Sequence, residues 1–382
     1  MPLRKIIAPI RELSDSGKLS GLLLLLATLV SLALSNSAWG PRYLHLWHTE
    51  VGAGGLVKSL AHWVDDGLMV VFFFLVGLEI KREVLYGELT DVRHALLPVL
   101  AAAGGVAVPA GIYLLCTAGT PAAHGWAIPT ATDIAFSLGI LSLLGSRIPP
   151  GLRIFLTALA IIDDLLAVLI IAVFYTAGLH LGYLLAATGL LALLVALNRL
   201  RVSWLPVYLL LGLGLWFAVL QSGIHATIAG VLLALTIPTA SIEKLEHALQ
   251  KPVSYLILPV FALANTAIVL SGEAVTGLLS PLGLGVGLGL LLGKPLGISA
   301  ATWLAVKTGV SGLPARVTWR MLLGLGFTAG IGFTMAIFIA NLSFTEPARI
   351  DVAKLAVIAG SVLAALVGVA ILKTAPEAED EA

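Results

Sequence analysis

The sequence predicts an all-α membrane protein that crosses the bilayer many times, and three observations lead to this prediction. Of the 382 residues, 59% are hydrophobic and 11% are charged, whereas a soluble domain carries about 25% charged residues. The mean hydropathy is +1.03. Apolar runs long enough to span a bilayer recur along the whole chain, divided by charges, prolines and turn residues. These observations favour a single integral membrane domain over residues 1–382.

Division of the apolar sequence at these points predicts twelve transmembrane helices of roughly 20 residues each. The longest uncharged runs are divided at turn signals such as Gly178 and the pair Ser222–Gly223. The predicted spans are 19–36, 60–86, 95–117, 122–144, 151–176, 181–198, 204–220, 223–238, 252–271, 281–306, 320–341 and 354–373.

The distribution of basic residues predicts the orientation of these spans. An even number of spans places both termini on one side, and 17 of the 22 lysines and arginines lie at connections on that side. The positive-inside rule therefore predicts cytoplasmic termini. Residues 1–18 become a cytoplasmic lead-in, 41–58 a periplasmic loop and 374–382 an acidic cytoplasmic tail. The net charge of +1 gives no indication of nucleic-acid binding.

Two adjacent carboxylates lie in the middle of the fifth span, in the stretch A-I-I-D-D-L-L-A at 160–167. An ionised carboxylate in hydrocarbon is costly, so Asp163 and Asp164 are expected to face a cavity, a partner or an ion pathway. Neighbouring residues on a helix point about 100° apart, which predicts different roles for the two. A capping or loop pair is the alternative, but the sequence on both sides stays apolar and contains no turn residues.

Spans 4 and 11 contain helix-breaking sequences. Span 4 includes A-I-P-T-A-T-D at 127–133, where Pro129 removes a backbone donor, Thr132 offers a hydroxyl and Asp133 could cap a new helix. Span 11 includes T-A-G-I-G-F-T-M at 328–335. A simple proline kink and close glycine packing are the alternatives. Two such segments, interrupted at mid-membrane and far apart in the chain, are typical of a secondary transporter built from inverted repeats.

Lys294 lies about twelve residues from either limit of span 10 and therefore needs a carboxylate partner. The candidates are Asp163, Asp164 and Asp133. Pairing of Asp163 with Lys294, with Asp164 left for an ion, is the favoured arrangement, and the opposite assignment stays open. Such a group titrates as a coupled unit.

Further titratable residues lie near the ends of spans. Glu79 and Glu83 are four residues apart on one helix face and could attract cations or simply be solvated. His225 could report pH or be structural. Glu246 and His247 could regulate activity or be plain exposed residues, and Asp66 belongs to an acidic pair at the start of span 2. Phosphate-binding, metal-ligand and dinucleotide motifs are absent from the sequence, so no cofactor is expected and an ion gradient must supply the energy, unless the protein conducts passively.

Several long motifs closely resemble the NhaA family of bacterial sodium/proton antiporters, in order from about residue 19 to residue 373. They are W-V-D-D-G-L-M (63–69), V-F-F-F-L-V-G-L-E-I-K-R-E (71–83), A-I-P-T-A-T-D (127–133), F-L-T-A-L-A-I-I-D-D (155–164), S-G-I-H-A-T-I-A-G (222–230), G-K-P-L-G-I (293–298) and G-I-G-F-T-M-A-I-F-I-A (330–340).

The resemblance implies a bacterial inner-membrane protein of twelve spans, with broken helices 4 and 11 crossing near the membrane centre. It implies electrogenic exchange of more than one proton for each Na⁺ or Li⁺. By position, the ion and proton site comprises Asp163, Asp164, Asp133, Thr132 and Lys294. The residues linked to pH response or to a cation funnel are Asp66, Glu79, Glu83, His225, Glu246 and His247.

Two departures from the family pattern affect what the resemblance implies. Glu243 and Gln250 stand where a basic residue and a second histidine are expected, which affects the pH set-point. The segment 41–58 is short, which weakens the inference that its hairpin forms a homodimer.

The predicted function is pH-regulated antiport by alternating access, not catalysis. Asp164, helped by Asp163, binds either Na⁺ or Li⁺ or protons, because hard carboxylate and hydroxyl oxygens suit these cations. A sodium-coupled solute symporter of similar architecture is one rival. An intramembrane aspartyl protease is another, disfavoured by Lys294 and by the absence of a G-x-G-D motif.

Overall fold

The computed structural model describes residues 18–53, 56–87, 89–176 and 178–375. The predicted lead-in, apart from Lys18, and the predicted tail after Ala375 lie outside the described residues. The chain divides into two compact units. Unit 1 comprises Met1–Leu29, Asp91–Asp164 and Ile268–Ala382, and unit 2 comprises Val30–Thr90 and Leu165–Ala267.

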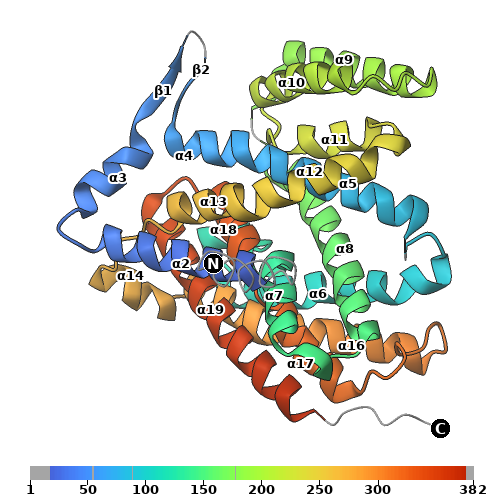
Figure 1. Cartoon of the computed structure of the whole chain (residues 1–382). Helices are drawn as coiled ribbons and strands as arrows, with labels where there is room; N and C mark the ends of the chain where they lie inside the picture. The colour runs from blue at the N-terminus through green and yellow to red at the C-terminus, as the bar shows by residue number, and fades with distance from the viewer. Residues whose placement is uncertain (1–17, 54–55, 88, 177, 376–382) are drawn as a thin grey trace, which may run out of the picture. The chain divides into compact units, whose positions relative to one another are not determined.

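All regular secondary structure in the described part of unit 1 is helical, and its longest helices are labelled in Figure 1. Its helices are α6 (Val92–Thr117), α7 (Ile134–Leu143), α14 (Gly272–Thr276), α15 (Pro281–Leu288), α16 (Lys294–Lys307), α17 (Trp319–Ala329), α18 (Phe333–Ser343) and α19 (Pro347–Thr374). Two longer helices, α2 (Lys18–Ser35) and α8 (Pro150–Phe174), contain residues of both units. A π-helical turn, η8 (Gly289–Gly293), connects α15 to α16.

A crossing of α6 and α16 depends on two glycines. A Cβ atom on Gly104 would lie 2.3 Å from the Gly297 carbonyl oxygen, and one on Gly297 would lie 2.1 Å from the Gly104 oxygen. Because any side chain there would overlap the facing backbone, the two helices can approach this closely only through glycine. The approach places Lys294, the first residue of α16, in the interior of unit 1.

Unit 2 combines helices with one β-hairpin. Its helices are α3 (Gly40–His48), α4 (Leu60–Trp63), α5 (Met69–Tyr86), α9 (Leu181–Arg199), α10 (Leu205–Ser222), α11 (Ile228–Thr236), α12 (Ile242–Pro252) and α13 (Leu258–Asn265). Strands β1 (Glu50–Ala53) and β2 (Leu56–Ser59) pair antiparallel, with Val51 opposite Lys58. The predicted loop 41–58 therefore holds most of α3 and the hairpin. Helix α9 lies beside α10, and α11 lies against α5 (Figure 1).

Two of the predicted spans in unit 2 are shorter as helices than expected. Helix α11 covers Ile228–Thr236 of the predicted span 223–238. Gly223, with φ 87°, ends α10, and residues 224–227 form turns before α11 begins. At the other end Pro238 lacks a backbone donor and its ring disfavours a helix that continues through it. Helix α13 ends at Asn265, before the predicted limit of residue 271.

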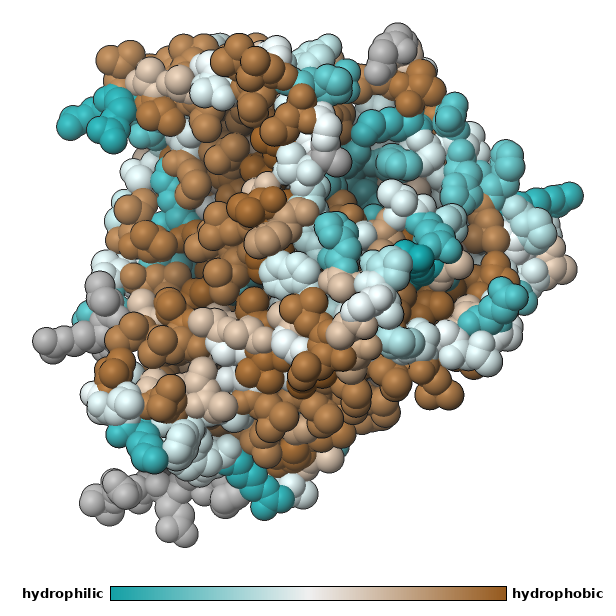
Figure 2. Space-filling view, turned by 180° about the vertical axis from the view of Figure 1, so that it is seen from behind, coloured by the Kyte–Doolittle hydropathy of each residue, from teal (hydrophilic) through white to brown (hydrophobic). Residues whose placement is uncertain are grey.

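Among the described residues, six helices are long and apolar enough to cross a membrane: Ala95–Thr117, Pro150–Phe174, Leu181–Arg199, Leu205–Ser222, Pro281–Lys307 and Pro347–Thr374. Four further pairs of helices pass the same test but bend by more than 40° at a short break. Hydrophobic side chains cover wide areas of the face drawn in Figure 2. These features are those of a multi-pass membrane protein, and the count of twelve spans stays a prediction.

Candidate functional site

Asp133 lies between the first turns of two helices of unit 1, α7 and α18. Its Oδ1 accepts a hydrogen bond from the Phe136 backbone N–H at 3.0 Å and so caps α7. Its Oδ2 accepts from the Thr334 N–H at 3.1 Å and from the Thr334 hydroxyl at 2.5 Å. One buried carboxylate thereby faces the positive ends of two helix dipoles, which favours an anion there.

Thr132, the residue before Asp133, connects two further parts of unit 1. Its Oγ1 lies 2.6 Å from Asp163 Oδ2 and 2.8 Å from the carbonyl oxygen of Ala329, the last residue of α17. A hydroxyl has a single hydrogen, so it can donate to one of these two oxygens at a time. The neighbouring Ser137 hydroxyl donates to the Thr328 carbonyl at 2.8 Å. Hydroxyls near α7 thus satisfy carbonyls at the end of α17.

Three charged side chains of unit 1 are almost fully buried. Exposed fractions are 0% for Lys294, 2% for Asp163 and 3% for Asp164. The Lys294 ammonium contacts Asp163 Oδ2 in an ion pair. Asp163 Oδ1 is buried and has no hydrogen-bond partner among the residues that the structure describes. The pair therefore leaves one carboxylate oxygen free to accept a further ligand.

The sequence-predicted site residues thus lie in one region of unit 1. Thr132 and Lys294 both contact Asp163, Asp133 follows Thr132, and Asp164 follows Asp163 on α8. Thr334 lies within the helix-breaking sequence 328–335 but was not assigned to the site from the sequence. Two further groups, the Ala329 carbonyl and Ser361, were not predicted from the sequence. The Ser361 Oγ accepts a hydrogen bond from the Phe333 N–H at 3.2 Å. A backbone carbonyl carries no signal in the sequence, and Ser361 lies in an ordinary apolar helix.

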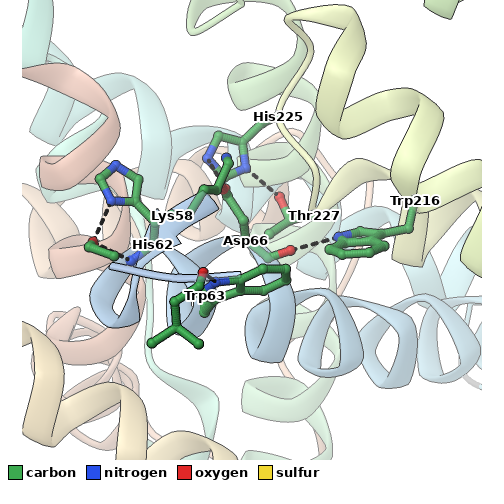
Figure 3. Close-up of polar contacts among 9 residues, drawn as sticks. Lys58, His62, Trp63, Asp66, Trp216, His225 and Thr227 are labelled. Carbon is green, nitrogen blue, oxygen red and sulfur yellow. Dashed lines mark hydrogen bonds and ion pairs between the residues drawn. The ribbon is translucent and has the colours of Figure 1, made fainter. Parts of the chain in front are cut away.

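The predicted residues at the start of span 2 form a second cluster, in unit 2 (Figure 3). The Lys58 ammonium, on β2, lies 2.6 Å from Asp66 Oδ2, and His225 Nε2 lies 3.8 Å from Asp66 Oδ1. His225 Nδ1 lies 3.0 Å from the Thr227 hydroxyl. The Trp216 indole donates to the Asp66 carbonyl oxygen at 2.8 Å. Asp66 therefore joins the hairpin to the segment before α11.

The remaining predicted residues lie near the end of α5 and on α12, the helix between α11 and α13 in the connection between spans 8 and 9. Arg82 makes ion pairs with Glu83, at 2.6 Å, and with Glu246, at 2.9 Å. Burial raises the pKa of Glu246 above its ordinary value, and the Arg82 guanidinium opposes that shift. His247 lines a polar cavity of about 590 Å³ beside Glu246. Glu79 lies one turn before Glu83 on α5.

Buried ionisable side chains that lie beside helix ends, in a chain with several membrane-spanning helices, are the features of a membrane transporter of small ions. Comparison with known proteins narrows this class. The family model described as Na⁺/H⁺ antiporter 1 matches residues 11–372.

Relatives of similar length extend over almost the whole chain. The Flavobacterium johnsoniae Na⁺/H⁺ antiporter NhaA 2 is 54% identical over 370 residues, covering 94% of this chain and 91% of that protein. The Bordetella parapertussis Na⁺/H⁺ antiporter NhaA is 49% identical, covering 99% of this chain and all of that protein. The NhaA of Oleidesulfovibrio alaskensis is 45% identical, covering 97% and 95%. The chain therefore belongs to the NhaA family of Na⁺/H⁺ antiporters.

Proposed function

We propose that this protein exchanges Na⁺ or Li⁺ for protons across the bacterial inner membrane. The observation that carries the proposal is the buried Asp163 carboxylate, which pairs with Lys294 through one oxygen. Its other oxygen has no hydrogen-bond partner among the described residues. Carboxylate and hydroxyl oxygens are the hard ligands that small alkali cations prefer, and the Thr132 hydroxyl adjoins this carboxylate.

In the proposed cycle the site holds either a cation or protons. A Na⁺ ion bound by Asp164 and Asp163 competes with the Lys294 ammonium for the same negative charge. Protons that bind the two carboxylates remove that charge and expel the cation. Cation and protons are therefore alternative ligands of one site, which is the requirement for an obligatory exchange.

Access to this site alternates in the proposal. Twelve spans with cytoplasmic termini form inverted repeats. The predicted spans 4 (122–144) and 11 (320–341), interrupted near mid-membrane, rock together around the bound ion. Entry of more than one proton for each cation makes the exchange electrogenic. The Asp66–His225 and Arg82–Glu246 clusters adjust activity to pH, with Glu79, Glu83 and His247 beside the second. The β1–β2 hairpin is the proposed contact of a homodimer.

Everted membrane vesicles from cells that lack their own sodium antiporters provide the test. The vesicles are energised to acidify the lumen, and Na⁺, Li⁺ or K⁺ is added while a pH-sensitive dye is followed from about pH 6.5 to about pH 9. Na⁺ and Li⁺ should collapse the gradient, K⁺ should not, and Asp164→Asn should be silent. Equal expression of the variant, measured on the same membranes, is the control.

The same vesicles distinguish the rival functions. If no cation changes the dye signal, the exchange proposal fails, and sodium-driven solute uptake becomes the next assay. Cleavage of a membrane peptide substrate by the purified protein would indicate an aspartyl protease. An aspartyl protease needs two carboxylates that share one proton, whereas Asp163 here is paired with an ammonium.

A further inference from the structure

Unit 2 contains a cavity of about 360 Å³ bordered by the segment Trp63–Phe74 and by α10, α11 and α12. Every lining residue is aliphatic, aromatic or glycine. Two tryptophans, Trp63 and Trp216, lie on its border with ring centres 6.3 Å apart. We call this space the indole cavity. Its size is within the range of sites that hold small ligands.

The two indoles offer the indole cavity no hydrogen-bond donor. The Trp63 N–H donates to the Val51 carbonyl oxygen at 2.8 Å, and the Trp216 N–H donates to the Asp66 carbonyl oxygen at 2.8 Å (Figure 3). An indole has one donor, so both are used. A polar ligand would lose its hydrogen bonds on entry, and a water molecule would lack the partners that hold buried water. The occupant must therefore be apolar.

The indole cavity opens through α10. Leu209 and Leu213, four residues apart on this helix, border it and are 43% and 60% exposed. Phe74 and Leu233, which also border it, are 7% and 8% exposed. In a membrane-spanning chain, exposed leucines in the middle of an apolar helix contact lipid hydrocarbon. The rim of the cavity therefore faces the bilayer, whereas its interior is buried within unit 2.

We propose that the indole cavity binds one acyl chain of a membrane phospholipid, packed against the rings of Trp63 and Trp216. An acyl chain that enters from the bilayer stays in an apolar medium, so the hydrophobic effect contributes little. The favourable free energy of binding comes instead from dispersion contacts with close-packed protein atoms. Without an occupant, the side chains that line this volume would lose those contacts. Phospholipid acyl chains are the apolar groups that surround the rim at the highest concentration.

The bound chain would support the cluster shown in Figure 3. Trp216 touches the acyl chain on its ring and holds the Asp66 backbone through its N–H, while the Asp66 side chain pairs with Lys58 of the hairpin. This inference requires only that the protein is embedded in a membrane, and it does not depend on which ion is exchanged. Its failure would leave the antiport proposal unaffected.

Photolabelling of the full-length protein in detergent-free phospholipid vesicles tests the proposal. The vesicles contain a trace of phosphatidylcholine with a diazirine near the end of one acyl chain, and labelled residues are mapped by mass spectrometry after irradiation. Label on the buried Phe74 or Leu233, beside label on the exposed Leu185 of α9, is the expected result. Label on Leu185 without any label on the two buried residues would overturn the proposal.

A filling substitution adds a matched comparison. A Cβ atom on Gly67, which lines the indole cavity, would have Trp63 as its neighbour at an ordinary 3.6 Å, so Gly67→Leu places its side chain in the open space. Label on Phe74 and Leu233 should fall at least about fivefold, a change of about 1 kcal/mol or more in occupancy. Gly189→Leu, on α9 with no atom within 4 Å of its Cβ, should change nothing.

The outcomes of this comparison are distinct. Undiminished label in a folded Gly67→Leu variant, or equal label from a lipid with the diazirine on its headgroup, would refute acyl-chain binding in the indole cavity. If Gly67→Leu does not fold, the wild-type experiment decides: label on Phe74 or Leu233 relative to label on Leu185 supports acyl-chain binding, and its absence from both buried residues refutes it.

Discussion

The ion pair between Asp163 and Lys294 determines what a change of a single residue does at the ion site. Both side chains are buried, and neither charge has bulk water to stabilise it. Removal of one partner leaves the other charge uncompensated, whereas removal of both charges leaves a neutral interior. The two kinds of substitution therefore have opposite consequences for stability, although both abolish the proposed exchange of charge.

Lys294→Met should destabilise the folded protein by about 3–5 kcal/mol, because it leaves Asp163 without its cation. The double variant Lys294→Met with Asp163→Asn should recover most of that loss but should not restore exchange. The midpoint of thermal unfolding in one detergent, measured near neutral pH for the wild type, both single variants and the double variant, provides the check. A double variant no more stable than Lys294→Met alone would contradict the pairing.

Glu246 makes folded stability depend on pH. Its pKa is raised by burial, so between the ordinary carboxyl pKa and the raised one the folded protein holds a proton that the unfolded chain has lost. Stability from this residue should therefore fall as pH rises through that window and level off above it. Glu246→Gln should flatten this part of the profile, because it cannot titrate.

Unfolding midpoints from about pH 4 to about pH 8 measure this effect. Glu273→Gln, an exposed substitution on α14, away from Glu246, is the matched control and should keep the wild-type slope. Identical slopes for wild type and Glu246→Gln would show that Glu246 does not titrate in this window.

At the scale of elements, backbone packing places the site. Lys294 begins α16 after a π-helical turn, and α16 reaches α6 through the facing glycines 104 and 297. The sequence indicated that this lysine needs a carboxylate, because an ammonium deep in a span is costly alone. The sequence favoured Asp163, which is the partner in the structure, but left the opposite assignment open, because the angle at which α16 crosses α6 depends on contacts between distant segments.

Gly297→Ala should disrupt this crossing, because its Cβ would lie 2.1 Å from the Gly104 carbonyl oxygen. The helices must separate, at a cost of about 1–3 kcal/mol for overpacking, and Lys294 must move with α16. A lower unfolding midpoint and slower exchange in vesicles are the expected results. Gly287→Ala on α15, with no atom within 4 Å of the added Cβ, is the control and should be neutral. Equal effects of the two substitutions would argue against the crossing as the cause.

At the scale of the whole molecule, the apolar composition makes the chain a multi-pass membrane protein, and the proposed exchange moves charge across the membrane. Each elementary charge that crosses is worth about 2.3 kcal/mol per 100 mV. Entry of more than one proton for each Na⁺ that leaves carries positive charge inward. The membrane potential therefore acts directly on the proposed cycle.

Proteoliposomes loaded with Na⁺ provide the corresponding measurement. An interior-negative potential, set by a potassium gradient and valinomycin, should speed Na⁺ efflux, and a potential of opposite sign should slow it. Asp164→Asn proteoliposomes report the passive leak under each condition. Equal efflux rates at both potentials would indicate electroneutral exchange of one proton for one Na⁺.

The sequence alone determined the membrane class and the residue types of the candidate site. Apolar composition and buried charge carry large free-energy costs that depend little on the details of packing, so Asp163, Asp164 and Lys294 were evident. The late start of α11 at Ile228 was not predicted, because residues 224–227 contain neither proline nor glycine to mark the turn.

Only the tertiary structure decided which groups meet. Three contacts join segments that are far apart in the chain: Asp133 with Thr334 at the start of α18, Thr132 with the Ala329 carbonyl, and Lys294 with Asp163. Such contacts depend on how the packed helices cross. The positions of backbone carbonyls and of cavities such as the indole cavity cannot be predicted from the sequence, because they too depend on packing. The energetic need for a partner can be read locally, whereas the identity of the partner is set by the packing of the whole unit.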